Sequence, residues 1–457
     1  MRVAIIGAGP AGLFIGSGLA RRGHEVTLVD PDPGPPAAGR WKRRGVMQFH
    51  HAHAFRHQIA LHALEQEMPG FLERWMKEGA EPLHTPSSEG SQIPVGMRSL
   101  RLTFEQVLRA SALSDTGLTF RQGHVDGVLS RGGRAVGLRV GRAELQADLV
   151  IDASGRRGRT WVLGVTGGRR RARPEPTCGG PCGIAYVDRQ YQLHPGAEPG
   201  PLLSPIGWQA EFNGYQAIIF LHERGIFSVL LVRPTTDAFL ANLRHEAAFN
   251  AACQAIPDLA AWTDPNRSSP ITPVLAGGHL FNTYRGQMGN DGQLALPGLL
   301  FAGDAVATTT PTFGRGITTT LLQGKELLRL VDQFSTDVSA IGESFEAWCA
   351  DYIKPWVEDH IHMDAWTRRR LVGEEISPSE PLPSHLILAA AEADPEIRAA
   401  ASSFMAMTAL PSALHSEEPR ARAVYASGWR PQRASGPDRT ELADILRKAL
   451  DGGTATS

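Results

Sequence analysis

The chain has 457 residues, of which 42% are hydrophobic and 20% charged, and its formal net charge is −1. This balance is ordinary for a globular enzyme and excludes the strong basic field that attracts nucleic acid or an acidic membrane. Four cysteines are too few for a disulfide framework, and no long apolar run follows the first twenty residues. We therefore expect a cytoplasmic protein of two or three lobes with no integral membrane segment and no nucleic-acid partner.

The first twelve residues are typical of a nucleotide-binding βαβ unit. RVAII at 2–6 reads as a buried strand, and GAGPAG at 7–12 matches the pattern G-x-G-x-x-G directly after it. The first glycine permits a tight turn, the second leaves room for a pyrophosphate, and the third lets the next helix pack closely on the strand. The free N–H groups of that helix would bind the phosphates. The predicted contacts are Gly7, Gly9, Pro10, Ala11 and Gly12.

The second strand, EVTLV at 25–29, is followed by Asp30, 23 residues after Gly7. An acid at this place accepts hydrogen bonds from the adenosine ribose in dinucleotide-binding folds. The alternative interpretation of the uncharged residues 3–20 is a secretory signal. A signal explains neither the glycine spacing nor the acid, and no clear cleavage site precedes the strand. We therefore predict a dinucleotide site, and the motif alone leaves NAD and FAD open.

A basic loop, WKRRG at 41–45, and five histidines between 50 and 62 come next. Such a loop is mostly solvated, and Arg44 is the residue that we expect to pair with a phosphate or to line the cofactor. His53 and His57 have the spacing of a helical zinc pair, but no adjacent glutamate or third ligand completes a site. We therefore predict no metal there, and none at the two cysteines of CGGPC.

Residues 298–324 form a second candidate cofactor segment. GLLFAG reads as a short strand that ends on Gly303 and Asp304, and a loop leads to a helix from about Ile317. The simpler interpretation is another βα turn. In the second interpretation, Asp304 binds the ribityl chain of a flavin, and the helix N-terminus near Gly314 and Gly316 stabilises the negative charge of reduced flavin.

The rest of the chain indicates how the domains are arranged. Residues 166–284 contain antiparallel strands that would roof the cofactor, and GGRRRARPEP at 167–176 is read as a polar loop without a function. From 336 on the pattern is helical. We predict a discontinuous cofactor domain (1–75, 97–165 and 285–335), a substrate domain (76–96 and 166–284), a helical region (336–415) and an extended tail with a short helix (416–457).

Three of these segments resemble a known family. The motif at 7–12 with Asp30, DLVIDASG at 148–155 and GDAVATTTPTFGRG at 303–316 look like the FAD-dependent aromatic hydroxylase and epoxidase superfamily, which has the para-hydroxybenzoate hydroxylase fold. The resemblance covers about residues 1–335. It is nearest to the branch of styrene-monooxygenase-like and polyether-epoxidase-like enzymes, because Gln48, His51 and His53 match that branch's Q-x-x-H-x-H pattern.

The resemblance implies an α/β fold, in which a Rossmann-like FAD-binding domain of the glutathione-reductase type is interrupted by an antiparallel β-sheet substrate domain and followed by C-terminal helices. It implies that His51 and His53 lie beside the flavin ring, where they orient substrate or shuttle protons, or make only structural hydrogen bonds. The remaining FAD-binding positions that it implies are Arg44, Arg101, Val125 (through its backbone), Asp152, Gly303, Asp304, Pro311, Gly314, Gly316 and Ile317.

The implied activity is that of an FAD-dependent monooxygenase, which inserts one oxygen atom of O2 into an organic substrate through a flavin C4a-(hydro)peroxide. The source of electrons stays open between NAD(P)H and a separate flavin reductase. No second G-x-G-x-x-G follows a strand, and the middle motif's usual D-G-x-x-S-x-x-R has Gly158 and Trp161 at its last two fixed positions.

Other flavin chemistries remain as alternatives. A reductase of the geranylgeranyl-reductase type shares the segment near 303, and a non-catalytic FAD-binding module would retain the same motifs. A flavin-dependent halogenase is disfavoured, because we find no W-x-W-x-I-P stretch in the chain.

Overall fold

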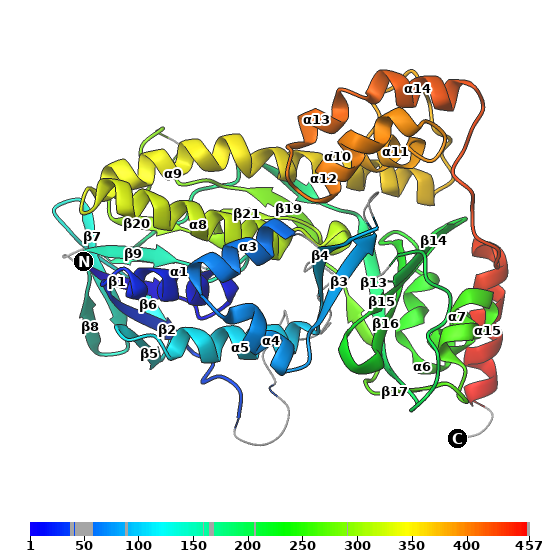
Figure 1. The fold of residues 1–457 in the computed structure, drawn as a ribbon, viewed down its shortest axis with the longest axis horizontal. Helices are drawn as coiled ribbons and strands as arrows, with labels where there is room; N and C mark the ends of the chain where they lie inside the picture. Colours follow the sequence, from blue (N-terminus) through cyan, green and yellow to red (C-terminus); the bar gives the residue numbers. More distant parts are fainter. Residues whose placement is uncertain are drawn as a thin grey trace.

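The structure is a computed structural model that describes residues 1–36, 41, 58–86, 90–158, 160–163, 169–204, 207–289 and 291–454. Its N-terminal part is built on a parallel five-stranded sheet in the order β20-β9-β1-β2-β5 (Figure 1). These strands are β1 (Arg2–Ile6), β2 (Glu25–Asp30), β5 (Leu118–Gln122), β9 (Leu149–Asp152) and β20 (Leu299–Phe301). Segments about 300 residues apart in the sequence therefore end at the same edge of one sheet.

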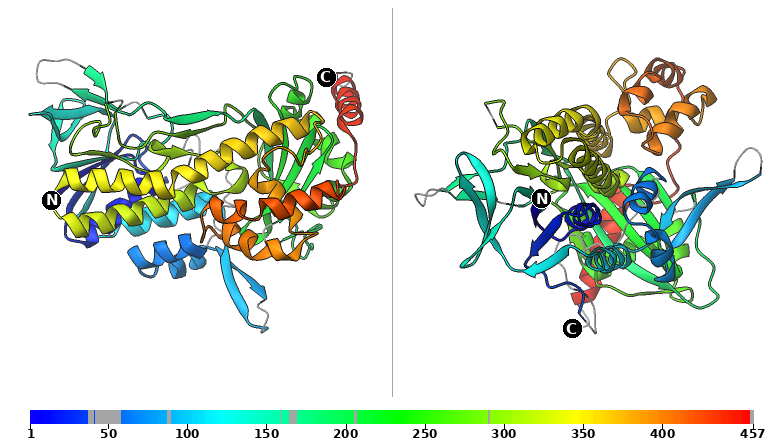
Figure 2. Two further views of the ribbon diagram at one scale, coloured as in Figure 1. Left: turned by 90° about the horizontal axis from the view of Figure 1, so that it is seen from above. Right: turned by 60° about the vertical axis from the view of Figure 1, so that its left-hand side comes forward.

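Helices cover one face of this sheet and a second sheet packs on the other. The helices are α1 (Pro10–Arg21), α3 (Gln58–Glu67), α4 (Phe71–Lys77), α5 (Arg101–Leu113), α8 (Gly316–Phe334) and α9 (Val338–Tyr352). The second sheet has the order β11-β10-β6-β7-β8, with β6 (Val125–Arg131), β7 (Arg134–Val140), β8 (Ala143–Gln146), β10 (Trp161–Leu163) and β11 (Arg169–Arg171). Figure 2 shows α8 and α9 running side by side.

Small residues let α1 lie close to its neighbours. A Cβ atom on Gly16 would come within 2.9 Å of the Leu118 side chain on β5, and one on Gly18 would overlap Leu328 of α8. The helix is therefore held between the parallel sheet and α8, and its N-terminus is directed by packing on both sides.

The second part of the molecule is an antiparallel sheet with the order β14-β15-β16-β13-β17, which β18 joins through β13. Its strands are β13 (Ile184–Leu193), β14 (Gly207–Phe212), β15 (Tyr215–Leu221), β16 (Ile226–Pro234), β17 (Ser268–Pro270) and β18 (Leu275–Gly277). One face packs on α6 (Glu246–Ala255), α7 (Pro257–Thr263) and α15 (Arg439–Thr454) in a separate core. Because side chains alternate along a strand, the residues between those core positions line the opposite face.

The predicted fold class is confirmed: a parallel Rossmann-like sheet is combined with antiparallel sheets and C-terminal helices. Smaller elements join the parts, namely the hairpin β3 (Glu81–Pro86) and β4 (Gln92–Arg98) and the sheet of β12 (Cys178–Pro181), β19 (Phe281–Tyr284) and β21 (Ala307–Thr308). The domain boundaries that we derived from the sequence stay a prediction. Within the described ranges, no helix has the length and apolarity needed to cross a bilayer.

The C-terminal region corrects one expectation. The first part of the tail from 416, expected to be extended, contains α14 (Glu418–Ala426), and the chain ends in α15 as predicted. Ala421 and Tyr425, one turn apart, are buried in the core of the C-terminal helices, and the Tyr425 hydroxyl donates to the Leu386 carbonyl at 2.8 Å. Tertiary packing thus stabilises a helix of low intrinsic amphipathicity. We call the group of α11 (Ser384–Ala390), α12 (Arg398–Met405), α13 (Pro411–His415) and α14 the helical lobe, and it packs on α10 (Lys354–Leu371).

Candidate functional site

The glycine-rich turn after β1 is shaped by close backbone contacts. Gly7 has φ +101°, and a Cβ atom there would lie 2.6 Å from the Ala153 carbonyl oxygen after β9. A Cβ on Gly12 would overlap the carbonyl oxygen of Gly7. Both positions therefore exclude any larger residue. At Gly7 the positive φ and the close contact both favour glycine, and at Gly12 the close contact alone does. Asp30 completes the turn, because its Oδ2 accepts a hydrogen bond from Ala8 N at 2.7 Å.

The N-terminus of α1 lies beside this turn. Gly9 is its N-cap in an extended conformation (φ −84°, ψ −175°), Pro10 is the first helical residue, and no side chain in the described part of the chain caps the helix. The first N–H groups of a helix have no partner within it, and they carry a partial positive charge. Gly9, Pro10 and Ala11 thus lie where a phosphate would bind, as predicted from the motif.

The segment after β20 packs directly on that turn. Gly303 has φ +66°, and a Cβ atom there would lie 2.9 Å from the Ala11 Cβ. Its N–H donates to Gln323 Oε1 on α8 at 2.9 Å. The structure therefore brings together two motifs that lie almost 300 residues apart in the sequence.

Asp304 follows in the same segment and provides a test for a bound cofactor. It is partly buried, and no group among the described residues hydrogen-bonds its carboxylate. Burial raises the pKa of Asp304, and the positive charges of Arg101, Arg156 and Arg173 partly oppose this increase. A buried acceptor without a donor is costly. The hydroxyl groups of a ribityl chain are the kind of donor that this carboxylate lacks, so the residues fit FAD.

Arg173 joins this segment to the loop after β9. Its guanidinium group donates to the carbonyls of Gly155, Arg156, Gly158, Asp304 and Ala305, with N–O distances from 2.7 to 3.3 Å. The side chain is 4% exposed, and burial lowers its pKa. The sequence analysis gave no function to the loop that contains Arg173. Only the crowding of arginines in GGRRRARPEP signalled it, and such runs are mostly solvated.

In the middle motif, the presence of Gly158 in place of the usual serine has a structural explanation in the loop after β9. Asp152 Oδ1 accepts from Ser154 N at 2.9 Å and Ser154 Oγ at 2.5 Å, and Asp152 Oδ2 accepts from the Thr160 hydroxyl. A Cβ on Gly158 would overlap Ser154 Oγ. The serine that usually follows in this motif therefore has no room at 158 while Ser154 holds this conformation. Asp152 supports the loop, and its carboxylate is already engaged.

Two further predicted positions lie at the edges of the same site. Arg101 is the first residue of α5, and its Nε is 2.7 Å from Glu105 Oε1. Val125 begins β6 two residues after Gly123, whose N–H donates to the Asp30 carbonyl at 3.0 Å. Val125 therefore starts close to Asp30, the residue predicted to bind the ribose. Arg44, His51 and His53 lie outside the described residues, so their predicted roles stay predictions.

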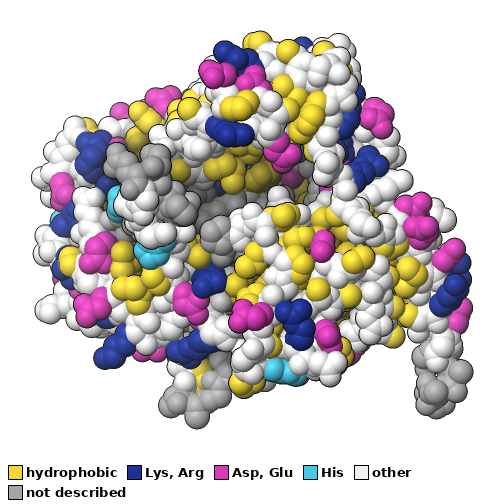
Figure 3. Space-filling model, turned by 45° about the vertical axis from the view of Figure 1, so that its right-hand side comes forward, with side chains coloured by type: hydrophobic (Ala, Val, Ile, Leu, Met, Phe, Trp, Pro, Cys, Tyr) yellow, Lys and Arg dark blue, Asp and Glu magenta, His cyan; other side chains and the backbone are white. Residues whose placement is uncertain are grey.

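A pocket lies between the antiparallel sheet and the segment that leads to α8. It encloses roughly 360 Å³, including space open to solvent. The segment contributes Pro311 and Thr312, and the sheet contributes mainly apolar side chains with Tyr186 and Gln216. Burial raises the pKa of Tyr186, so its hydroxyl stays protonated at neutral pH. Figure 3 shows a face of the molecule that is hollowed beneath the helical lobe, with hydrophobic side chains around the hollow.

The remaining predicted positions connect the pocket to α8. Gly314 ends the 3₁₀ turn Pro311–Phe313, Gly316 begins α8, and Ile317 is buried. No acidic residue lies in the first turn of α8, and none of the side chains that the structure describes caps it. Its N-terminus therefore keeps the positive potential that a reduced flavin ring would use.

Comparison with protein families gives a match in the N-terminal part of the chain. A family model described as FAD dependent oxidoreductase matches residues 2–90. A search among curated proteins found no significant match.

Solved structures share the fold over most of the chain. The flavin-dependent brominase Bmp2 is 14% identical, with a TM-score of 0.61 and coverage of 100% of both chains. The probable FAD-dependent monooxygenase pqsL from Pseudomonas aeruginosa is 14% identical, with a TM-score of 0.54 over 81% of this chain and 98% of its own. The myxobacterial chondrochloren halogenase CndH is 16% identical, with a TM-score of 0.52 over 99% and 97%. The N-terminal segment thus matches the FAD dependent oxidoreductase family model, and the chain shares its fold with solved flavin monooxygenases and halogenases.

Proposed function

We propose that the chain is an FAD-dependent monooxygenase that transfers one oxygen atom from O2 to an organic substrate. The observation that carries the proposal is the apolar pocket bounded by Pro311 and Thr312, because the same segment begins at Asp304 and leads to the α8 N-terminus. A substrate in this pocket would lie next to the reactive part of the flavin. Bound and reduced FAD supplies the two electrons with which one oxygen atom enters substrate and the other becomes water.

The residues of the chain would bind the cofactor and exclude water. The α1 N-terminus would hold the pyrophosphate, Asp30 the ribose and Asp304 the ribityl chain. The apolar side chains of β13, β15 and β16 would keep water away from the reaction. His51 and His53 stay candidates for orienting substrate. The electrons would come from NAD(P)H or from a partner reductase.

A flavin-dependent halogenase is a second candidate, because the brominase shares the fold over the entire chain, including the helical region after residue 336. The absence of W-x-W-x-I-P weighs against it. Both reactions need reduced FAD and O2, and only the halogenase needs a halide ion. The dependence of product formation on bromide or chloride therefore separates the two candidates.

The first test uses the FAD-loaded protein without oxygen. NADH or NADPH is added, and the loss of flavin absorbance near 450 nm reports whether the chain reduces its own cofactor. Reduced protein is then mixed with ¹⁸O₂ and panels of aromatic and alkene substrates in halide-free buffer. Products that carry one ¹⁸O atom support the proposal. Turnover without ¹⁸O incorporation, by reduction of a C=C bond, would favour the reductase alternative instead.

A further inference from the structure

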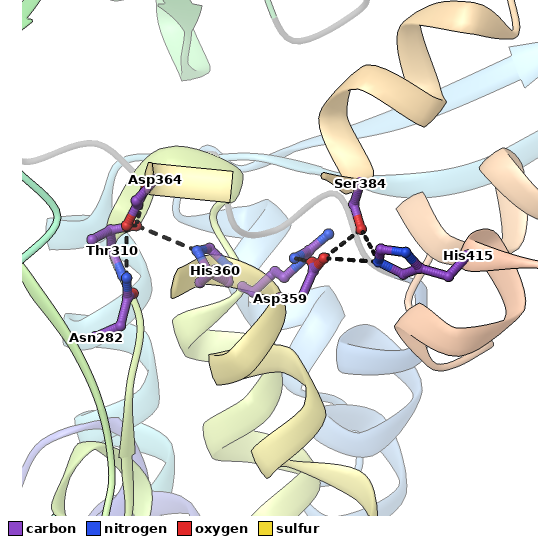
Figure 4. A network of polar contacts seen from close by, with 8 residues as sticks. Asn282, Thr310, Asp359, His360, Asp364, Ser384 and His415 are labelled. Atoms are coloured by element: carbon purple, nitrogen blue, oxygen red, sulfur yellow. Dashed lines mark hydrogen bonds and ion pairs between the residues drawn. The ribbon is translucent and has the colours of Figure 1, made fainter. Parts of the chain in front are cut away.

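The segment from Thr310 to Arg315, which includes both pocket residues Pro311 and Thr312, is held at its two ends by one helix. That helix is α10, which lies outside the region of family resemblance. Figure 4 shows the contacts: Asp364 lies at the start of the segment, and Asp359 lies at its end together with two residues of the helical lobe.

The start of the segment is held through Asp364 and Asn282. Asp364 Oδ2 accepts from Thr310 Oγ1 at 3.0 Å and from Asn282 Nδ2 at 2.6 Å. The Asn282 Oδ1 atom accepts from Thr310 N at 2.8 Å. Thr310 is 1% exposed and Asn282 is also 1% exposed. Backbone and side chain of Thr310 are thus both engaged, which leaves this residue one conformation.

The end of the segment is held through Arg315 and Asp359. The Arg315 guanidinium is 2% exposed, its Nη1 is 3.0 Å from Asp359 Oδ2, and its Cζ lies 4.6 Å from the Trp356 ring and 4.4 Å from the Phe404 ring. Burial lowers the pKa of Arg315 to about 10, so it stays charged at neutral pH. Burial also acts to raise the pKa of Asp359, but contacts from His415 and Arg315 outweigh it and leave the pKa low.

Asp359 also connects this segment to the helical lobe. Its Oδ1 accepts from the Ser384 hydroxyl on α11 and lies 3.7 Å from His415 Nε2 on α13. One carboxylate therefore binds the loop before α8 on one side and the lobe on the other. A salt bridge of this kind is weak evidence for stability, because desolvation offsets its attraction, and such pairs serve better to select one geometry.

We propose that Asp359 and Asp364 are positioning residues that set the geometry of residues 310–315, and with it the pocket wall and the α8 N-terminus. The inference rests on the proposed function in one respect, namely that this segment faces the flavin. In this proposal α10 and the helical lobe, which lie outside the cofactor motifs, help to shape the site.

The contacts of Asp364 with Thr310 and Asn282 are expected to depend on pH, because its carboxyl group is buried among other titratable groups. The titratable groups around it are Asp359, His360 and Arg368 on α10 and Cys182 before β13, beside the neutral partners Asn282 and Thr310. Burial raises the pKa of Asp364 to about 6, while burial lowers that of His360 to about 3. Above pH 6 the ionised carboxylate accepts both hydrogen bonds. Below pH 6 the carboxyl group of Asp364 is protonated and one of its oxygens becomes a donor, which changes its hydrogen bonding with Thr310.

The first experiment compares the oxidised FAD-loaded wild type with Asp364→Asn and with Asp351→Asn, an exposed control on α9. Flavin absorbance and fluorescence are recorded from pH 5 to pH 8. We expect a one-proton transition near pH 6 in the wild type and in the control, and its loss in Asp364→Asn. An unchanged transition in Asp364→Asn, or none in the wild type, would overturn the role of Asp364. No turnover is required, so failure of the oxygenation proposal leaves this readout valid.

The second experiment tests Asp359. Asp359→Asn leaves the Arg315 charge buried without its counterion, so the variant is expected to unfold at lower temperature. The double variant Arg315→Met with Asp359→Asn removes that charge and should recover the thermal midpoint. If Asp359 positions the segment, the double variant still shows an altered flavin spectrum and a Kd for FAD raised roughly ten-fold. Recovery of both properties would show that Asp359 has only a structural role.

Discussion

The two segments that meet at the candidate flavin site are held in place by different means. The turn at 7–12 is shaped by its own glycines, by Asp30 and by the Ala153 carbonyl oxygen, which lies close to Gly7. The segment at 303–316 is positioned by polar contacts with Gln323 on α8 and with three side chains from far along the sequence, Arg173, Asp359 and Asp364. Close steric contacts therefore define the first segment, and polar contacts define the second. Substitutions in the first segment should destabilise the protein by steric overlap, and those in the second by the loss of polar contacts.

The largest expected effect tests the steric part of this comparison. Gly12→Ala places a methyl group against the carbonyl oxygen of Gly7, so the turn must move. We expect a loss of about 3 kcal/mol in unfolding free energy, typical of severe overpacking, together with loss of bound FAD. Urea unfolding and FAD retention on gel filtration measure both. The matched control is Gly180→Ala in β12, where nothing lies within 4 Å of the added atom. Equal stability of the two variants would contradict the steric explanation.

The next effect concerns the polar contacts of the second segment. Arg173→Lys keeps the positive charge, but an ammonium group cannot donate to all five carbonyls that the guanidinium group contacts. Buried carbonyls without donors should lower the unfolding free energy by about 2 kcal/mol. Arg171→Lys is the control, because Arg171 forms an exposed pair with Glu175. A Tm for Arg173→Lys that equals the control's would show that these hydrogen bonds do not hold the segment.

A smaller effect separates binding from stability. Asp304→Asn removes a carboxylate that has no hydrogen-bond donor among the described residues, so the FAD-free protein should keep its Tm. FAD itself should bind roughly ten-fold more weakly, since an amide accepts hydrogen bonds less strongly than a carboxylate. Titration of FAD-free protein, followed by flavin fluorescence, measures the Kd, with Asp351→Asn as the control. An unchanged Kd would exclude Asp304 as a cofactor contact.

The smallest effect concerns the lobe. The contact with Asp359 raises the pKa of His415, although burial opposes it, so the folded state holds this proton more tightly than the unfolded chain. The stabilisation is then fully present below the unfolded pKa of about 6.5 and is lost as pH rises through the folded value. His415→Gln should cost about 0.5 kcal/mol at pH 6 and nothing at pH 9. Thermal unfolding at both pH values, with the exposed His245→Gln as control, tests this. An equal loss at both pH values would contradict the linkage.

The sequence predicted some parts of the site well and others poorly. The strand before Gly7, the helix from Pro10 and the start of α8 are confirmed, because hydrophobic periodicity and glycine spacing encode them locally. The helix α14 was missed because proline and arginine in its sequence suggested an extended tail, whereas burial of Ala421 and Tyr425 in the lobe stabilises it. Arg173 was missed because an arginine in a basic run looks the same whether solvated or buried.

The sequence by itself thus determined the glycine-rich turn after β1, the order of the candidate cofactor motifs and the α/β class of the fold. It could do so because these features depend on residues within a few turns of chain or on regular alternation. Only the tertiary structure decided that Gly303 packs on Ala11, that Arg173 joins two loops, and that α10 holds the pocket wall through Asp359 and Asp364. Each of these contacts links residues separated by long stretches of chain, and their partners follow from packing that no local pattern records.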